Sequence, residues 1–149
     1  MHKSILQPRL VVFVLFAALL AGCQPLGGVG LVTSSATAEL TPEAASSIAG
    51  DMVGRFAEQV GPGTTTIQLE PDGSIFGEAL ESSLKGWGYA VATDQTTEGT
   101  ATVPLAYVVD AFEGSIPVRL STRTLDLTRM YQMGGEGATP ISPLSVMQR

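Results

Sequence analysis

The stretch TTTIQLEPDGSIFGEALESSLKGWGYAVAT, residues 64–93, decides the predicted fold because it reads as strand, helix and strand. It begins with β-branched residues in a short alternation, which is typical of a strand. The Glu70–Gly73 segment predicts a turn, and Ser74 is a good N-cap for a helix that runs to about Lys85. Two glycines then release the chain into a second strand, residues 89–93. If the two strands pair in parallel, their crossover should be right-handed.

A longer amphipathic helix is predicted immediately before this unit. Thr41 is a good N-cap, Pro42 suits the first helical position, and Glu43 complements the helix dipole. Apolar residues recur at helical spacing as far as Val60, and the Gly61–Gly63 segment ends the helix. The apolar residues predict one face packed on a core: Ala45, Ile48, Ala49, Met52, Val53, Phe56 and Val60.

The residues that follow the strand–helix–strand unit predict an antiparallel meander. Strand-like runs cover residues 102–110, 115–121 and 124–131, with turn-forming residues between them. Proline cannot donate to a strand ladder, so Pro104 and Pro117 should lie at the beginning of a strand, at a bulge or on a sheet edge.

Together these elements predict one small α+β domain over residues 41–132, with two helices packed on one face of a small mixed or antiparallel sheet. Residues 23–40 are rich in Gly, Ser, Thr and Ala without a regular period, which predicts a flexible tether. An alternative is that Val29–Val32 pack as a strand against a partner. Gly, Pro and Ser return in residues 133–149, which predicts a loose C-terminal tail.

The N-terminal residues have the parts of a secretory signal. Basic residues precede an apolar run, Leu10–Leu20, which is shorter than the roughly 20 residues that a transmembrane helix needs. The run ends in Leu-Ala-Gly-Cys, which resembles the lipobox of bacterial lipoproteins, where a peptidase cleaves before an acylated cysteine. We therefore predict that residues 1–22 are a signal peptide, that cleavage falls between Gly22 and Cys23, and that the Cys23 thiol carries diacylglycerol.

The cysteine content favours this interpretation. Cys23 is the only cysteine, and a lone cysteine in an exported protein would otherwise pair between chains or remain a reactive thiol. The alternatives are a transmembrane anchor, or an ordinary cleaved signal with a chance cysteine. The next residue is Gln24, not the aspartate that tends to retain lipoproteins of enteric-type bacteria in the inner membrane. We therefore expect an outer-membrane lipoprotein that faces the periplasm and is held by its acyl chains.

Composition argues against several function classes. Removal of residues 1–22 leaves six basic and 14 acidic residues, a formal charge of −8 that repels nucleic acid and anionic lipid. The only histidine, His2, lies in the predicted signal, which excludes Ser-His-Asp and Cys-His catalysis and zinc sites with His or Cys ligands. We expect no metal, no cofactor, no direct nucleic-acid binding and no enzymatic activity.

Two features of the second helix remain as candidates for function. Glu78 and Glu81 lie one helical turn apart and could form an acid/base pair, although a solvated helix face is the favoured interpretation. Trp87 is expected to belong to the core, with an anchor for a partner protein as the alternative.

Three further stretches carry a family resemblance: LTPEAA with IAGDMV in residues 40–53, FGEAL with KGWGYAV in residues 76–91, and ATPISPLSVM in residues 138–147. They resemble the TrbH family, the lipoproteins of the conjugal transfer (Trb) type IV secretion systems of conjugative plasmids and integrative elements. With the lipobox, the resemblance covers nearly the whole chain. The Gly-Trp-Gly-Tyr sequence is more specific than the lipobox, which many unrelated proteins share.

The resemblance implies a structural role in mating-pair formation, in the outer-membrane part of the secretion channel. Its implied partners are periplasmic and outer-membrane core subunits of that channel, and it carries over no catalytic or cofactor-binding residues. Edge strands could accept a neighbour's strand, within limits set by Pro104, Pro117 and the charges. The alternative function is a stand-alone lipoprotein that binds or regulates a cell-envelope partner. A third possibility is an enzyme that uses carboxylates alone.

Overall fold

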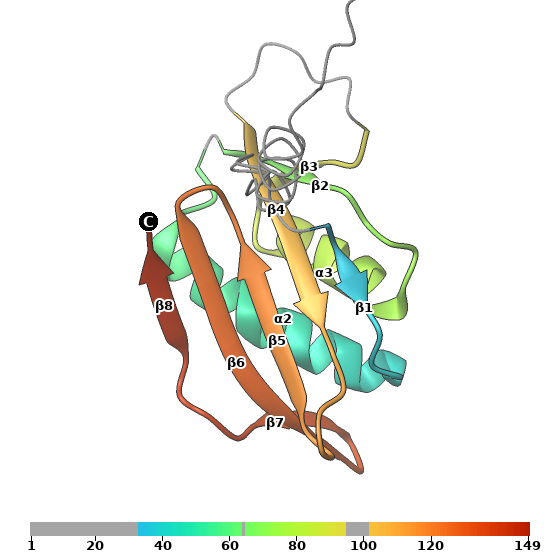
Figure 1. The fold of residues 1–149 in the computed structure, drawn as a ribbon. Helices are drawn as coiled ribbons and strands as arrows, with labels where there is room; N and C mark the ends of the chain where they lie inside the picture. The colour runs from blue at the N-terminus through green and yellow to red at the C-terminus, as the bar shows by residue number, and fades with distance from the viewer. Residues whose placement is uncertain (1–32, 64, 95–101) are drawn as a thin grey trace, which may run out of the picture. The chain divides into compact units, whose positions relative to one another are not determined.

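The computed structural model describes residues 33–63, 65–94 and 102–149, which form an open mixed sheet with two helices on one face (Figure 1). This arrangement confirms the predicted α+β class. The elements in chain order are β1 (Ser35–Ala36), α2 (Pro42–Gln59), β2 (Thr66–Leu69), α3 (Ile75–Gly86), β3 (Ala90–Ala92), β4 (Thr102–Val109), β5 (Ile116–Ser121), β6 (Leu125–Gly134), β7 (Gly137–Pro140) and β8 (Ser145–Gln148).

Both helices begin where their capping residues predicted. The Thr41 hydroxyl accepts a hydrogen bond from the Ala44 N–H at 3.2 Å, and Pro42 occupies the first turn of α2. The Ser74 hydroxyl accepts the Gly77 N–H at 3.1 Å and starts α3. Each cap satisfies a backbone donor that has no partner inside its helix, so the caps fix where the two helices start.

The sheet has the order β3-β2-β4-β5-β6-β7 and combines two kinds of pairing. β2 lies between β3 and β4 and is parallel to both, so the strand–helix–strand unit pairs in parallel as considered from the sequence. β4, β5 and β6 form the predicted antiparallel meander. Helix α3 connects β2 to β3 and packs with α2 in the helical layer.

Each end strand of the meander carries two short strands along its outer edge. β2 pairs with residues 102–105 of β4, and β1 continues along the same strand at Val108 and Val109. In the same way, β8 pairs with residues 125–128 of β6, and β7 pairs with residues 131–134. The four short strands therefore satisfy backbone groups that the long strands β4 and β6 would otherwise leave unpaired.

The two prolines lie in internal strands, near the strand beginnings. The ladder between β4 and β5 joins Ala106–Val109 to Val118–Ser121, and both Pro104 and Pro117 fall just outside it. Of the three places considered, the beginning of a strand therefore fits. Neither proline lies on β1, β3, β7 or β8, the strands on the outer edges of the sheet.

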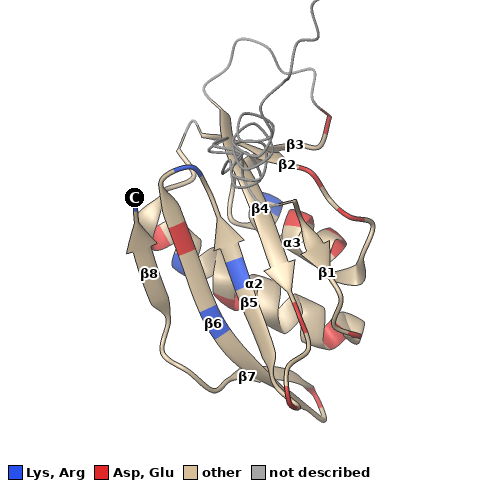
Figure 2. Cartoon of the chain, viewed as in Figure 1, with Lys and Arg blue, Asp and Glu red and all other residues tan. Residues whose placement is uncertain are grey.

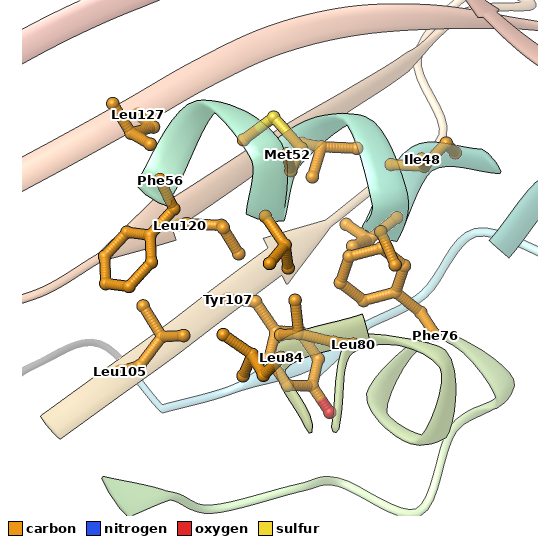
Figure 3. Packing of buried hydrophobic residues seen from close by; sticks show 14 of the residues in the cluster. Ile48, Met52, Phe56, Phe76, Leu80, Leu84, Leu105, Tyr107, Leu120 and Leu127 are labelled. Carbon is orange, nitrogen blue, oxygen red and sulfur yellow. The ribbon is translucent and has the colours of Figure 1, made fainter. Parts of the chain in front are cut away.

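The core lies between the helices and the sheet (Figure 3). Phe56 of α2 and Phe76 of α3 are buried against it, and Tyr107 and Tyr131 rise into it from the sheet with exposed fractions of 0%. The Phe76 and Tyr107 rings meet edge to face, with 5.3 Å between their centroids. The apolar side chains shown around them come from both layers: Ile48, Met52, Leu80, Leu84, Leu105, Leu120 and Leu127.

The predictions for the two ends of the domain were wrong in the part of the chain that the structure describes. Residues 133–149 are not a loose tail, because they form β7 and β8 on the edge of β6. The predicted tether 23–40 is not free throughout, because β1 pairs with β4 and Ser34 is buried. Gly137 also packs directly on α2, where a Cβ atom would collide with Ser47. The domain therefore extends beyond residues 41–132 at both ends.

Candidate interaction surface

The predicted lipidation site lies outside the described residues. Cleavage between Gly22 and Cys23, and acylation of Cys23, therefore remain predictions from the sequence. Neither α2 nor α3, the helices that the structure describes, has the length and apolar character that crossing a membrane requires.

The predicted carboxylate pair lies on the outer surface of α3. Glu81 accepts a hydrogen bond from the Lys85 ammonium at 2.6 Å, and Glu78 is exposed. A shallow groove between the two helices runs past Glu78, with Pro42 and Ile75 also in its lining. This is the arrangement of a solvated helix face. In the described ranges, no three His, Cys, Asp or Glu side chains are grouped so that they could hold a metal ion.

The prediction that Trp87 belongs to the core was wrong. Trp87 caps the C-terminus of α3 and is 50% exposed. Its indole lies over Gly54 of α2, where a Cβ would come within 3.2 Å of the ring. The flanking Gly86 and Gly88 could have indicated this from the sequence. They end helix α3, so the Trp87 side chain no longer follows the buried face of the helix. A half-exposed tryptophan is typical of an anchor in protein interfaces.

A network around Asp72 holds β1 and the start of α3 against the sheet. The Asp72 carboxylate accepts hydrogen bonds from the Tyr107 hydroxyl at 2.6 Å and from the backbone N–H of Ala36 at 2.7 Å. It also accepts from the backbone N–H of Ser74 at 3.0 Å. In return, the Tyr107 hydroxyl accepts the Asp72 N–H at 3.0 Å. We call these residues the Asp72 network.

The network changes the acidity of its members. Burial raises the pKa of the Asp72 carboxyl, but the hydrogen bonds from Ser74, Tyr107 and Ala36 outweigh burial and leave that pKa below its ordinary value. Burial, together with the neighbouring Asp72 carboxylate, raises the pKa of Tyr107 to about 12. At physiological pH Asp72 is therefore ionised and can accept the hydrogen bond, and Tyr107 is neutral and can donate it.

A second cluster ties α2 to the C-terminal strands. Asp51 of α2 accepts hydrogen bonds from the Arg129 guanidinium at 2.8 Å and from the Tyr131 hydroxyl at 2.6 Å. Burial and the Asp51 carboxylate raise the pKa of Tyr131. Arg129 also donates to the Ser142 carbonyl at 3.0 Å, and the Ser142 hydroxyl accepts the Met130 N–H at 2.9 Å. These bonds fix the connection between β7 and β8 on the edge of β6.

A buried carboxylate, Asp126, lies beside β8. It is 3% exposed, and one of its oxygens accepts two hydrogen bonds from the C-terminal Arg149, at 3.1 Å from Nε and 2.5 Å from Nη2. Its other oxygen has no hydrogen-bond partner among the described residues. Burial raises the pKa of the Asp126 carboxyl, while Ser121, Arg149 and Arg119 lower it, and the net shift is downward. The pair fixes the C-terminus against β6.

The strand β8 lies on the outer edge of β6, and all of its residues are exposed. Val146 and Met147 are 43% and 55% exposed, and Ile141, which directly follows β7, is 50% exposed. Figure 2 shows no charged residue on β8. We call the outward side of this strand the β8 edge. Like Trp87, it presents apolar residues of types that favour contact with another protein.

Comparison with known proteins accounts for nearly the whole chain. Residues 26–149 match the sequence model of the family described as "Conjugal transfer protein TrbH". The chain belongs to the TrbH family. The probable conjugal transfer protein TrbH of Sinorhizobium fredii (strain NBRC 101917 / NGR234) is 46% identical over 146 residues, which are 95% of this chain and 98% of that protein. No solved structure matches.

Membership of the TrbH family connects the chain with conjugal transfer and agrees with the resemblance seen in the sequence. The family match reaches residue 149, so it includes β7, β8 and Arg149. It also begins before β1, which places the Asp72 network inside the matched region. The TrbH match therefore covers both the Trp87 surface and the β8 edge.

Proposed function

We propose that this TrbH-family chain is a lipid-anchored assembly subunit of the conjugal transfer apparatus, which acts through protein contacts in the periplasm. The acyl chains on Cys23 would hold it in the outer membrane, and its partners would be periplasmic and outer-membrane subunits of the secretion channel. Family membership supports the role in conjugal transfer. The lipobox-like Leu20–Cys23 sequence supports the anchor.

The position of the first described residues supports a location near the membrane. Thr33 follows Cys23 by ten residues. Such a segment spans at most about 33–36 Å when it is fully extended. An anchor on Cys23 would thus keep the domain in the layer of periplasm next to the bilayer, where it could meet the periplasmic parts of membrane-embedded subunits.

The observation that carries the protein-contact part of the proposal is Trp87, a large aromatic side chain held half-exposed on a rigid part of the fold. The indole is fixed against Gly54 and lies at the capped end of α3. Aromatic residues contribute much of the binding energy of protein interfaces because they bury a large area at a small cost in conformational entropy. An arrangement that leaves such a side chain half in water is consistent with a partner that covers it.

The anchor is tested with Cys23→Ser. This variant should lose the acyl chains, leave the membrane fraction and fail to support plasmid transfer. Intact-mass spectrometry of the purified mature chain gives the direct measurement. A wild-type chain with a bare thiol or an uncut leader would contradict the proposed anchor, whatever the transfer assay shows.

The contact surface is tested with Trp87→Ala in the anchored chain. The variant should remain folded but copurify with fewer apparatus subunits from detergent-solubilised membranes. About half of the side chain is buried, so the free energy of unfolding should fall by about 2 kcal/mol, less than the roughly 3–5 kcal/mol of a fully buried tryptophan. Phe112→Ala is the matched control, because Phe112 is 58% exposed on the β4–β5 turn. Equal copurification of both variants with wild type would contradict a role for Trp87.

A further inference from the structure

The hydrogen bond at the C-terminus shows which backbone groups of β8 face outward. The backbone N–H of Arg149 donates to the backbone carbonyl of Thr124, just before β6, at 2.9 Å. The backbone groups of Arg149 therefore face β6. Residues alternate in an antiparallel ladder between those that bond to the neighbour and those that face away. With the register of Met147 on Asp126 and Ser145 on Thr128, the residues that face away are Val146 and Gln148.

β8 is a short strand, as exposed edges often are, but its outward groups at Val146 and Gln148 lack the other usual protections. Natural sheets cover or guard a terminal strand with lysine, proline, a bulge or a neighbouring element. The sequence of β8 is Ser-Val-Met-Gln, and within the described ranges no strand pairs with its outer side. In Figure 1, β8 forms the outermost strand on its side of the sheet. The β8 edge can therefore accept another strand.

We propose that this strand is β8 of a second copy, paired antiparallel about a two-fold axis through Met147. In this arrangement each Val146 exchanges both of its outward backbone hydrogen bonds with Gln148 of the second copy. The two Met147 residues then form a non-hydrogen-bonded pair, in which side chains lie closest together. The outward groups match each other because they lie symmetrically on either side of Met147, as a two-fold interface requires.

Charge supports a second copy at this edge rather than elsewhere on the surface. The mature chain would have a formal charge of −8, so two copies repel each other over most of their surface. β8 carries no charge, and the charged residues beside it, Asp126 and Arg149, already pair with each other. Like charges are therefore not placed against each other when β8 meets β8.

The pairing is small and depends on the membrane. A contact of short strands buries well under the roughly 1,200 Å² of a stable interface, so it should be weak between free chains in solution. Two chains anchored in one bilayer meet at a much higher effective concentration. The inference rests on the proposed anchored role, and it would let one subunit continue the sheet of the next within the apparatus.

Disulfide trapping of full-length, anchored Met147→Cys in native membranes tests the proposal. Cα atoms of a non-hydrogen-bonded antiparallel pair lie about 4.5 Å apart, within the roughly 4.4–6.8 Å that a disulfide spans. Oxidation should therefore give a covalent homodimer. Phe112→Cys is the control, because it places an equally exposed thiol on the β4–β5 turn and should remain monomeric.

The other outcomes of the trapping experiment contradict either the β8 pairing or the lipid anchor. No homodimer beyond the Phe112→Cys level would overturn the pairing, and so would a disulfide to a different protein. A disulfide dimer of the unsubstituted chain would instead show a free Cys23 thiol, so it would contradict the proposed lipid anchor and not the β8 contact. Failure of the inference and failure of the proposed function are in this way distinguished.

A proline at position 146 separates backbone pairing from chance proximity. Val146→Pro removes an outward N–H, while the bonds from β8 to β6 are made by its neighbours. In the Met147→Cys background, the loss of one hydrogen bond per copy should reduce trapping about tenfold or more. Unchanged trapping in this double variant would overturn the strand pairing. As a control, β8 of the monomeric Val146→Pro variant should be cleaved by protease no faster than β8 of the wild-type chain, which would show that the strand still pairs with β6.

Discussion

The strands β1 and β8 lie on opposite sides of the sheet and are attached in similar ways. Each is a short strand on the outer edge of a longer one, β1 on β4 and β8 on β6. Each is held by a carboxylate whose pKa is lowered, Asp72 beside β1 and Asp126 beside β8. They differ in where the contacts lead. Asp72 binds Tyr107, which is completely buried, whereas Asp126 binds Arg149, whose side chain is 46% exposed.

This difference predicts how far the effect of a single substitution extends through the fold. Disruption of the Asp72 network moves a core tyrosine, so it should lower the stability of the whole domain. Disruption of the Asp126–Arg149 pair should release only β8, which is exposed along its length and which the rest of the fold does not need. We therefore expect the contacts of β1 to affect the stability of the whole domain, and the contacts of β8 to affect β8 alone. Four experiments test this difference.

The largest effect is expected from Gly77→Ala. A Cβ at this position would collide with the Tyr107 hydroxyl and lie 3.3 Å from the Asp72 carboxylate. Crowding of a packed site and the loss of hydrogen bonds to a carboxylate should together cost about 3 kcal/mol in urea unfolding. Gly50→Ala in α2 is the control, because its Cβ would meet nothing within 4 Å and alanine favours the helix. Equal stability of the two variants would remove the claim that β1 is coupled to the core.

Tyr107→Phe removes the hydroxyl alone and should have the next largest effect. Its hydroxyl both donates to the Asp72 carboxylate and accepts the Asp72 N–H. We expect a loss of about 2 kcal/mol, limited because Asp72 itself reaches the solvent. The matched change Tyr89→Phe removes a hydroxyl that donates to the uncharged Val60 carbonyl, and should cost about 1 kcal/mol. The reverse order of the two variants would contradict the importance of the Asp72 network.

Arg149→Ala should have a smaller effect on global stability and a clear effect on β8. If Asp126 loses its partner, β8 can detach and return that carboxylate to water, which limits the loss to about 1 kcal/mol. Hydrogen exchange should accelerate at Met147, whose amide faces β6, and stay unchanged at Tyr107 and Val109 of β4. Global destabilisation as large as that of Tyr107→Phe would show that the two edges do not differ.

Acid should weaken both edges, with the smallest effect of the four. Asp72 and Asp126 have folded-state pKa values below their ordinary values, so their contribution to stability is present above about pH 4 and is lost as the pH falls. The urea midpoint should therefore decrease from about pH 6 to about pH 3. Tyr107→Phe should reduce this pH dependence, because it removes one of the bonds that lower the Asp72 pKa. A midpoint that rises toward acid would contradict the direction of both shifts.

Local patterns were sufficient to predict the centre of the molecule. The caps at Thr41 and Ser74, the helical spacing of apolar residues and the alternation of the β4–β6 segment each act over a few neighbouring residues. Such signals are present in the sequence itself, because capping and amphipathic burial depend on residues close in the chain. The α+β class followed from them, whereas the parallel pairing across α3 was left open until the structure showed it.

The strands on the two outer edges of the sheet depend on contacts between residues far apart in the chain. β1, β7 and β8 have only two to four residues each, and they become strands because β4 and β6 offer unpaired backbone groups along their outer edges. The pairings of Asp72 with Tyr107 and of Asp51 with Arg129 join residues far apart in the sequence. No local pattern encodes them. Local sequence patterns were enough to predict the helices, the meander and the lipobox-like motif. Long-range packing placed β1, β7 and β8 on the sheet edges and left Trp87 on the surface.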